Sequence, residues 1–580
     1  IPQLGDAARP CPMFATEPKS PAAFEPRKKE TVMSMTIDRR LLIKASMLGL
    51  GALSIPGAAQ ILGGQGFTHG VASGEPGLNS VLLWTRYVGS GDSKLRAEVA
   101  TDATFAKVVS GGEVTARAET DHTAKITVTG LQPGAWYFYR FVAPDGRISR
   151  IGRTRTLPQG DVSRFGIGLF SCSNMPYGWF NAYGHAAARN DIDLVIHCGD
   201  YLYEYDRGHY PTLEETVPGR VIEPANEMVT LADYRLRYAS YRLDPDLQAL
   251  HAAFPMIAQW DDHELANDAY IDGAENHQPD KEGEWSVRKN VAQRVYREWM
   301  PVSDAAYNSF QIGTLATIFR PETRTTGRSK QLAVREAIAG RGDLAKALTD
   351  FRDGAWSAKD RTLMGADQEQ WLYDGLAQSK SSGTAWQILA QQVVMGYGRF
   401  PLNAAQWVPA DAPDIVRKTL AGAVAASQAG LPYNMDSWDG YPAARNRLFD
   451  AALAVDADLV VLSGDSHNAW GYNLGERGPG QGGGKDRVGV EFAGHSVTSP
   501  GFEAYAKGVA PADLARALRD VNPGMAFCET SQRGYVSLDV TPQQVAGTWH
   551  FMQDIRTRAT QLAGSHRMTV QRGEKLLQDA

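Results

Sequence analysis

The stretch VIHCGDYLYEY (residues 195–205) joins a short run of β-forming residues to a cluster of polar side chains. Residues 195–198 are typical of a buried strand, and the strand ends at Gly199. Asp200 and Tyr203 follow at once. A single Asp after a strand usually caps a helix or starts a turn. If other strands of the chain also end in such polar side chains, a ligand site becomes the better interpretation of Asp200, because ligands of open α/β sheets bind at the carboxyl ends of strands.

The C-terminal part of the chain contains further segments of this kind. Long segments with helical spacing, such as residues 231–243 and 368–379, separate short apolar strands. The additional predicted strands lie within RFGIGLFSCSN (164–174), PMIAQWDDHE (255–264), AWQILAQQVVM (385–395) and DLVVLSGDSH (458–467). This alternation predicts a layered α/β domain with helices outside a sheet. We place this domain at residues 159–580, after the Leu-Pro-Gln-Gly sequence at 157–160.

The segment before this boundary has a different pattern. Between residues 67 and 156, short stretches with period-two hydrophobicity alternate with Gly, Asp, Asn and Pro. GLQPGAWYFYRF (130–141) resembles a turn and strand of a fibronectin-type or immunoglobulin-like module. We therefore expect a small β-sandwich over residues 63–158. No titratable cluster occurs in it, which favours a packing or positioning role.

The N-terminal segment predicts the cellular compartment. Arg39 and Arg40 precede a mildly apolar, Gly- and Ala-rich run that ends near Ala59. The run is shorter than the ~20 residues of a membrane span and ends in small residues, like a cleavable export signal. Twin arginines mark a bacterial export route, although an ordinary N-terminal helix is the alternative. We expect residues 1–62 to be a disordered leader and signal region. The twin-arginine export machinery is then a partner, and the mature protein is periplasmic or secreted without stable membrane insertion.

Composition narrows the classes of function. A chain of 580 residues exceeds the size at which one hydrophobic core usually stops growing, so more than one domain is expected. The formal net charge is -6, and the 59 Lys and Arg form no basic tract, which argues against a nucleic-acid partner. Three cysteines follow the leader: Cys172, Cys198 and Cys528. An odd number argues against a disulfide framework and suggests another role for at least one of them.

Four of the five predicted strands run into clusters of side chains that can bind metals. The clusters are residues 171–174, Asp200 with Tyr203, residues 261–264 with Asn267, and residues 465–468. Ordinary turn chemistry does not explain why the metal-binding types recur at four strand ends. The pattern therefore predicts a metal site.

The donor types indicate which cations the site prefers. An Asp such as Asp200 can bridge two cations, and a phenolate such as that of Tyr203 suits iron(III). A thiolate at Cys172 favours iron or zinc over calcium or magnesium. Oxygen donors near Asp262 and Asn267 suit a second, harder cation such as calcium, magnesium or manganese. Two cations ~3.5 to 4 Å apart can clamp both oxygens of a phosphoryl displacement.

Several blocks of the sequence together resemble a known family. Blocks distributed from Phe67 to Tyr535 carry the resemblance, in order: FTHGVASGEP, VLLWTR, SCSN, GDYLYEY, WDDHE, QQVVM, WDGYPAAR, SGDSH and QRGY. They are similar to the alkaline phosphatase D (PhoD-type) family of secreted bacterial phosphatases and phosphodiesterases. The resemblance implies a four-layer αββα metallophosphoesterase sandwich, preceded by an immunoglobulin-like domain. It also implies iron(III) and calcium as cofactors, with zinc, magnesium and manganese as the other cations to consider.

The resemblance also implies roles for individual residues. Cys172 and Tyr203 would ligate iron, and Asp200 would bridge iron and calcium at the catalytic centre. Asp465 and His467 would complete the metal set. The calcium-side donor stays open between Asp262 and Asn267. His263 would contact the phosphate or the leaving group, and Asn174 is a further candidate for substrate binding.

The expected function is that of an exported alkaline phosphatase. It would hydrolyse phosphomonoesters, phosphodiesters or both, through a hydroxide or oxide activated by two metals. One alternative is a phospholipase D-like or teichoic-acid phosphodiesterase on the same scaffold. Another is a catalytically retired envelope-binding protein. The sequence departs from the family at residues 321–324, where PETR replaces a Leu-Asp-Thr-Arg block, and we expect this change to alter the pocket wall.

Overall fold

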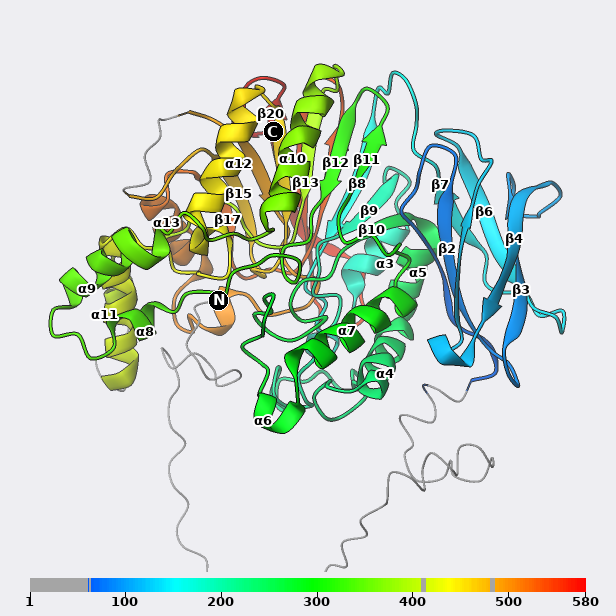
Figure 1. The fold of residues 1–580 in the computed structure, drawn as a ribbon, viewed down its shortest axis with the longest axis horizontal. Helices are drawn as coiled ribbons and strands as arrows, with labels where there is room; N and C mark the ends of the chain where they lie inside the picture. Colours follow the sequence, from blue (N-terminus) through cyan, green and yellow to red (C-terminus); the bar gives the residue numbers. More distant parts are fainter. Residues whose placement is uncertain (1–60, 62–63, 408–413, 480–485) are drawn as a thin grey trace, which may run out of the picture.

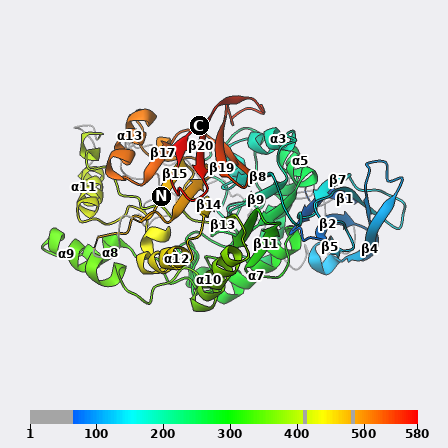
Figure 2. The same cartoon turned by 90° about the horizontal axis from the view of Figure 1, so that it is seen from above.

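The computed structural model describes residue 61 and residues 64–407, 414–479 and 486–580, arranged as in Figure 1. The predicted signal region with Arg39 and Arg40 lies outside these residues. A β-sandwich occupies one end of the molecule, and helices α8, α9 and α11 lie at the other end in both Figure 1 and Figure 2. In the part of the chain that is described, no helix is both long and apolar enough to cross a membrane.

A sheet of ten strands forms the first inner layer, in the order β21-β20-β19-β18-β8-β9-β10-β1-β2-β5. Its strands are β1 (Gly66–Gly74), β2 (Val81–Val88), β5 (Thr123–Val128), β8 (Phe165–Phe170), β9 (Leu194–His197), β10 (Pro255–Ala258), β18 (Gly534–Val540), β19 (Gln544–Met552), β20 (Leu562–Gln571) and β21 (Gln578–Asp579). The central strands β8, β9 and β10 run parallel, so their carboxyl ends meet at one edge.

A sheet of seven strands forms the second inner layer, in the order β11-β12-β13-β14-β16-β15-β17. Its strands are β11 (Asn308–Ile312), β12 (Ala316–Arg320), β13 (Trp386–Ala390), β14 (Leu459–Ser463), β15 (Ala469–Leu474), β16 (Gly489–Ala493) and β17 (Met525–Glu529). Strands β12, β13, β14 and β16 are parallel. Every residue of β8, β9, β10, β13 and β14 is buried, which explains why these strands are continuous apolar runs.

The two sheets pack face to face through one apolar core. Ile167 and Ile196 of the first sheet belong to the same cluster of buried side chains as Ile388 and Val460 of the second. Cys198 lies in this core as a small buried side chain with a free thiol.

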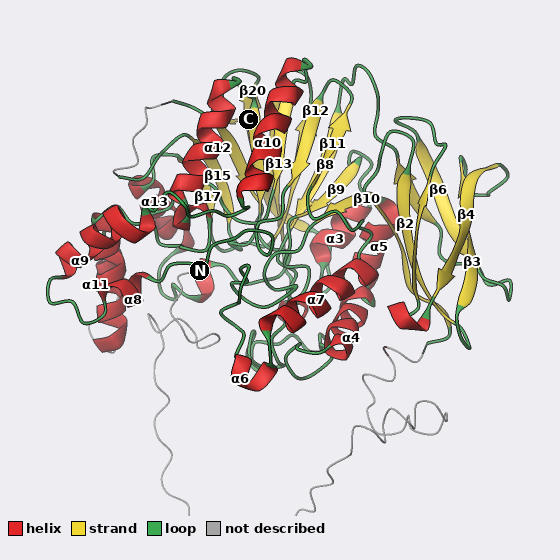
Figure 3. Ribbon diagram, viewed as in Figure 1, coloured by secondary structure: helices red, strands yellow, loops and turns green. Residues whose placement is uncertain are grey.

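Helices cover the outer faces of both sheets, as Figure 3 shows. The helices packed on the first sheet are α3 (Asn181–Ala187), α4 (Leu231–Arg242), α5 (Pro245–Ala253) and α7 (Trp285–Trp299), and those on the second are α10 (Ala366–Ser381), α12 (Pro442–Ala454) and α13 (Pro511–Val521). The remaining α-helices are α6 (Pro279–Glu282), α8 (Val334–Ile338), α9 (Leu344–Phe351) and α11 (Asp414–Gln428). The predicted four-layer αββα sandwich is confirmed.

The N-terminal β-sandwich is joined to this domain by strand pairing. Its outer sheet contains β3 (Ser93–Ala100), β4 (Val108–Ala116), β6 (Trp136–Val142) and β7 (Gly152–Arg155), in the order β4-β3-β6-β7. This sheet packs on β1, β2 and β5 through one apolar cluster. Strand β1 also pairs in parallel with β10, with Ser73 opposite Pro255. The second sheet of the sandwich is therefore continuous with the ten-stranded sheet, which the sequence did not predict. The predicted boundary at residues 158 and 159 falls between β7 and β8.

Candidate metal centre

The carboxyl ends of the parallel strands bring the predicted clusters together. Cys172 follows β8, and Asp200 follows β9. Asp262 follows β10, and Asp465 and His467 follow β14 of the second sheet. Ligand-capable atoms of these residues form groups in which all atoms lie within 4.8 Å of one another. The structure thus assembles one centre from strand ends that are far apart in the sequence.

The backbone at the centre is held in an unusual conformation. Four of these residues have a positive φ: 60° at Cys172, 52° at Asp200, and 62° at both Asp465 and His467. Residues with a Cβ rarely adopt this left-handed region, and such strain concentrates at functional sites. Gly199 also has a positive φ, of 98°, and a Cβ placed on it would lie 2.4 Å from the Cβ of Asp261. A side chain at this position would therefore separate the β9 and β10 loops.

Asp200 is common to three groups of ligand-capable side chains. The first group joins it to Cys172 and His467, the second joins it to Asp262 and His263, and the third joins it to Asp261, Asp262 and Asp465. The first group contains sulfur and imidazole donors, whereas the third contains only carboxylates. Soft donors on one side and hard donors on the other match two different cations, with Asp200 between them.

Tyr203 completes the softer side of the centre. Its hydroxyl lies 3.2 Å from Asp200 Oδ2, 3.1 Å from His467 Nε2 and 2.6 Å from Ser499 Oγ. His467 Nδ1 donates a hydrogen bond to the Pro500 carbonyl at 2.8 Å. Because this bond fixes the proton on Nδ1, the lone pair of Nε2 faces the Tyr203 hydroxyl and Asp200. An imidazole held in this way is ready to ligate a metal.

Unpartnered oxygens support a cation on the carboxylate side. Among the described residues, Asp200 Oδ1 and Asp261 Oδ2 are buried without a hydrogen-bond partner. A buried carboxylate oxygen without a partner is costly, and a bound cation removes that cost. The residues present therefore fit the metals that the sequence implied.

Burial shifts the pKa values of several candidate ligands towards their neutral forms. Burial and the neighbouring Asp200 raise the pKa of the Cys172 thiol and of the Tyr203 hydroxyl well above their ordinary values. Burial, together with the nearby carboxylates of Asp262 and Asp261, also raises the pKa of Asp200. Burial and Asp436 raise the pKa of Asp465 to about 6. A cation would reverse these shifts, because it stabilises the ionised form of every one of these ligands.

Arg324 is a fixed positive charge inside the same cluster. Its guanidinium is fully buried and lies 2.5 Å from Asp261, 2.8 Å from Asp436 and 3.4 Å from Asp262. Arg324 and His263 lower the pKa of Asp262 despite its burial. The sequence suggested only that residues 321–324 would alter the pocket wall. In the structure, Arg324 orients carboxylates on the hard-donor side.

His263 is held by a carboxylate that the sequence analysis missed. Its Nδ1 lies 2.7 Å from Glu204 Oε2, so Nε2 is the ring nitrogen left for the cluster. Burial lowers the pKa of His263, but Asp262, Glu204 and Asp200 raise it well above its ordinary value. Glu204 lies in the same YLYEY run as Tyr203, and nothing in its sequence context marked it.

The two candidates for the second-metal donor differ in their surroundings. Asp262 belongs to two of the ligand groups. Asn267 instead donates its side-chain amide to Glu275 at 3.0 Å and its backbone N–H to Glu204 at 2.7 Å. The Asp262 carboxylate thus lies among the other candidate ligands, and the side-chain amide of Asn267 is hydrogen-bonded to a carboxylate outside them.

Two other polar residues organise the loops of the centre. Asn174 donates to the Tyr210 carbonyl at 3.3 Å, and its own Oδ1 is buried without a partner. Glu264 accepts hydrogen bonds from the backbone N–H groups of Asp200, Tyr201 and Asp261 at 2.7 to 3.1 Å. It thereby ties the β9 loop to the β10 loop. The sequence placed Glu264 in a cluster but gave it no role.

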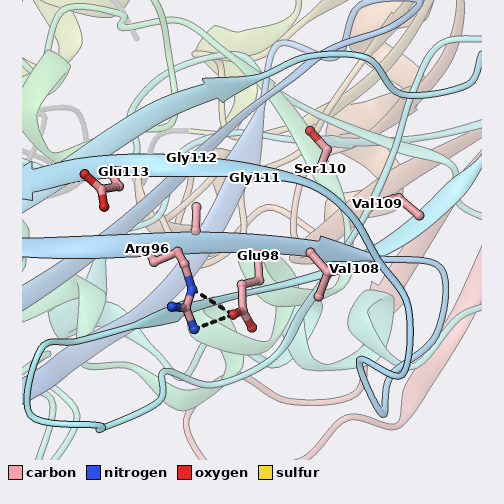
Figure 4. A pocket seen from close by; sticks show the side chains of 9 residues that line it. Arg96, Glu98, Val108, Val109, Ser110, Gly111, Gly112 and Glu113 are labelled. Carbon is pink, nitrogen blue, oxygen red and sulfur yellow. Dashed lines mark hydrogen bonds and ion pairs between the residues drawn. The ribbon is translucent and has the colours of Figure 1, made fainter.

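The surface hollow in Figure 4 is separate from this centre. It has a volume of about 460 Å³ and is formed by β3 and β4 of the N-terminal sandwich. None of the candidate ligands lines it.

A four-layer αββα sandwich with mixed soft and hard donors at its strand ends defines the metallophosphoesterase class. Comparison with known proteins narrows the class to a family. Residues 165–549 match the PhoD-like phosphatase family, and residues 54–158 match the PhoD-like phosphatase N-terminal domain. The chain belongs to the PhoD-like phosphatase family, as the sequence motifs predicted.

Two relatives illustrate the match. Alkaline phosphatase D of Bacillus subtilis (strain 168) is 32% identical over 560 residues, which covers 90% of this chain and 86% of that protein. The solved structure described as "Structure of PhoD" superposes with a TM-score of 0.71 at 30% identity, and the match covers 89% of this chain and 92% of that one.

Proposed function

We propose that the protein hydrolyses phosphate esters at a two-cation centre built around Asp200. The observation that carries the proposal is that Asp200 belongs to all three groups of ligand-capable side chains. The similarity to alkaline phosphatase D supports phosphatase activity as the reaction.

The chain offers separate donor sets for two cations. Cys172, Tyr203 and His467 would hold iron(III) together with Asp200, and Asp262 and Asp465 would hold calcium on its other side. When bound, the cations would neutralise phosphate charge and acidify water. Zinc, magnesium and manganese are the other cations to be tested by metal analysis.

His263 would act on the leaving group. Glu204 holds Nδ1 at 2.7 Å, so Nε2 is the ring nitrogen that would face the substrate. Its Nε2 would donate a proton to the departing alcohol oxygen and hydrogen-bond to a phosphate oxygen beforehand. Asn174 would bind the substrate through its unpaired Oδ1, for example by accepting from a substrate hydroxyl.

The proposal covers both phosphomonoesters and phosphodiesters as substrates. A phosphomonoesterase, a phospholipase D-like enzyme and a teichoic-acid phosphodiesterase would share this set of ligands and differ in the pocket walls. A retired envelope-binding protein is less well supported, because the predicted sulfur, phenol, imidazole and carboxylate donors are all in place.

The test is hydrolysis of p-nitrophenyl phosphate and bis(p-nitrophenyl) phosphate at alkaline pH, with bound metals measured in parallel. Activity should be lost on chelation and return with calcium. Asp200→Asn should lose activity and bound metal, whereas Asp304→Asn, at an exposed carboxylate after α7, should keep both. Full activity and metal content in Asp200→Asn would refute the proposed centre. The ratio of the two rates decides between monoesterase and diesterase.

We also propose export through the twin-arginine machinery, with the protein acting in the periplasm or outside the cell. The support is the sequence around Arg39 and Arg40, which lies outside the described residues. Replacing both arginines by lysine should retain the protein in the cytoplasm, as measured by cell fractionation. Unchanged export of that variant would contradict the proposal.

A further inference from the structure

A pocket of about 270 Å³ lies in the long connection between β9 and α4. Residues 206–222 form most of it, together with Pro176 from the segment that follows Cys172. We propose that this pocket, called here the 206–222 pocket, binds the apolar alcohol part of a phosphoester substrate. The inference rests on the proposed function and names the class of ester that the centre would favour.

The walls of the 206–222 pocket are mainly apolar. Pro176, Pro211 and Val217 are buried in it. Leu213 and Val221 also line it, although they are 68% and 50% exposed. Leu213 has the largest exposed fraction of any large apolar side chain among the described residues. An apolar ligand that covers this exposed apolar surface would bind favourably, because the surface is then removed from water.

The charged residues of the pocket are already paired within the protein. Arg220 binds Asp244 at 2.5 Å and also donates to the Gly178 carbonyl at 2.9 Å. Arg207 binds Glu223 at 2.9 Å. These carboxylates neutralise both guanidinium groups, so the pocket is poorly suited to a second phosphate. An uncharged apolar group fits it better.

Tyr210 connects the pocket to the metal centre. It lines the 206–222 pocket, and its hydroxyl lies 3.5 Å from Nδ1 of the candidate ligand His467. Its ring centroid is 5.7 Å from that of Tyr203. Asn174 holds the Tyr210 backbone carbonyl at 3.3 Å. Tyr210 therefore borders both the 206–222 pocket and the candidate ligands Tyr203 and His467.

The pocket is also preformed. Val217 donates its backbone N–H to the Pro176 carbonyl at 2.8 Å, which fastens the loop to the Cys172 segment. Arg237 donates to the carbonyls of Tyr205 and Pro224 at 3.0 and 3.1 Å, before and after the loop. A loop held at both ends loses little entropy when a ligand binds, so the burial of apolar surface contributes fully to affinity.

Water supplies the oxygen that forms the new P–O bond, the P–O bond to the alcohol breaks, and the alcohol leaves with a proton. An alkyl group on that alcohol would lie in the 206–222 pocket throughout the reaction. Each buried methylene contributes about 0.8 kcal/mol, which is roughly a fourfold gain in kcat/KM. We expect between about twofold and fourfold per methylene, since the pocket mouth is open.

The experiment compares ethyl, butyl and hexyl phosphate as substrates of the full chain. kcat/KM should rise along the series for the wild-type protein. Leu213→Asp and Val221→Asp should reduce the hexyl-to-ethyl ratio at least tenfold. Both side chains are exposed, so the fold should tolerate the changes. The matched control is Ile148→Asp, at an apolar side chain of the N-terminal sandwich that is 52% exposed, and it should keep the wild-type ratio.

A binding measurement separates the two proposals. Calorimetry with ethylphosphonate and hexylphosphonate should show tighter binding of the hexyl compound to the wild-type protein but not to Leu213→Asp. If ethyl phosphate is hydrolysed but neither rate nor affinity depends on chain length, the pocket assignment is wrong and the proposed function stands. If the hexyl compound binds more tightly but no ester is hydrolysed, the pocket assignment stands and the proposed function is wrong.

Discussion

Replacing Gly199 by Ala should destabilise the protein and empty the metal centre. The residue has a φ of 98°, and an added Cβ would lie 2.4 Å from Asp261 Cβ and 2.6 Å from Asp261 N. A left-handed conformation costs a residue with a Cβ about 1–2 kcal/mol. Overpacking against a fixed backbone adds typically about 1–3 kcal/mol. The expected loss in the free energy of unfolding is therefore about 2–5 kcal/mol.

Gly383→Ala is the matched control for this prediction. Gly383 has a similar φ of 81°, but nothing lies within 4 Å of an added Cβ. Only the conformational cost of about 1–2 kcal/mol should appear in this variant. Urea denaturation followed by tryptophan fluorescence measures both losses, and metal analysis measures bound iron and calcium. Equal destabilisation of the two variants, or full metal content in Gly199→Ala, would show that the close contact between the β9 and β10 loops does not constrain the centre.

Three other perturbations test the electrostatics and the ligands. Arg324→Met should lower the free energy of unfolding by about 3–5 kcal/mol, because it leaves buried carboxylates unpaired. Arg117→Met, at the exposed Arg117–Asp92 pair, should cost at most about 1 kcal/mol in the same denaturation assay. Comparable losses would contradict the role given to Arg324. Tyr203→Phe should remove bound iron. The control is Tyr201→Phe, which should retain the iron because the Tyr201 hydroxyl is hydrogen-bonded to His251 at 2.8 Å. If iron analysis finds no difference between the two variants, Tyr203 is not a ligand. Burial raises the pKa of Glu491 from 4.5 to about 7, so the native state holds a proton that the unfolded chain releases at lower pH. The free energy of unfolding should therefore fall by on the order of 3 kcal/mol as pH rises through this window, and Glu491→Gln should flatten that part of the pH profile. An unchanged profile in the variant would show that Glu491 is already ionised at low pH.

The sequence predicted five strands of the C-terminal domain, β8, β9, β10, β13 and β14, because each is a mainly apolar run ended by Gly or polar residues, but it did not predict β11, β12 or β15–β21. Cys172, Asp200, Asp262 and Asp465 could be assigned to one site because parallel strands bring their carboxyl ends to the same edge. The roles of the individual ligands were then inferred from the resemblance of the motifs to the family.

Other parts of the site could not be predicted from the sequence. Glu204 lies in an alternating run of tyrosines, and only the fold shows that it holds His263. Arg324 and Asp436 are distant from each other in sequence and pair only because the loops that follow the strands converge. Period-two hydrophobicity between residues 67 and 156 predicted a β-sandwich, but it does not specify that β1 pairs with β10 of the other domain.

The pairing of β1 with β10 has a consequence for how the protein is made. During synthesis the N-terminal sandwich leaves the ribosome long before Pro255, the residue that Ser73 faces in the finished sheet. Until then β1 has an open edge, and an open edge can recruit a strand from another chain. Completion of the N-terminal unit thus depends on the translation of β10. A nascent chain that stalls before β10 should be prone to aggregation, even though all the strands of its sandwich, β1 to β7, have already been made.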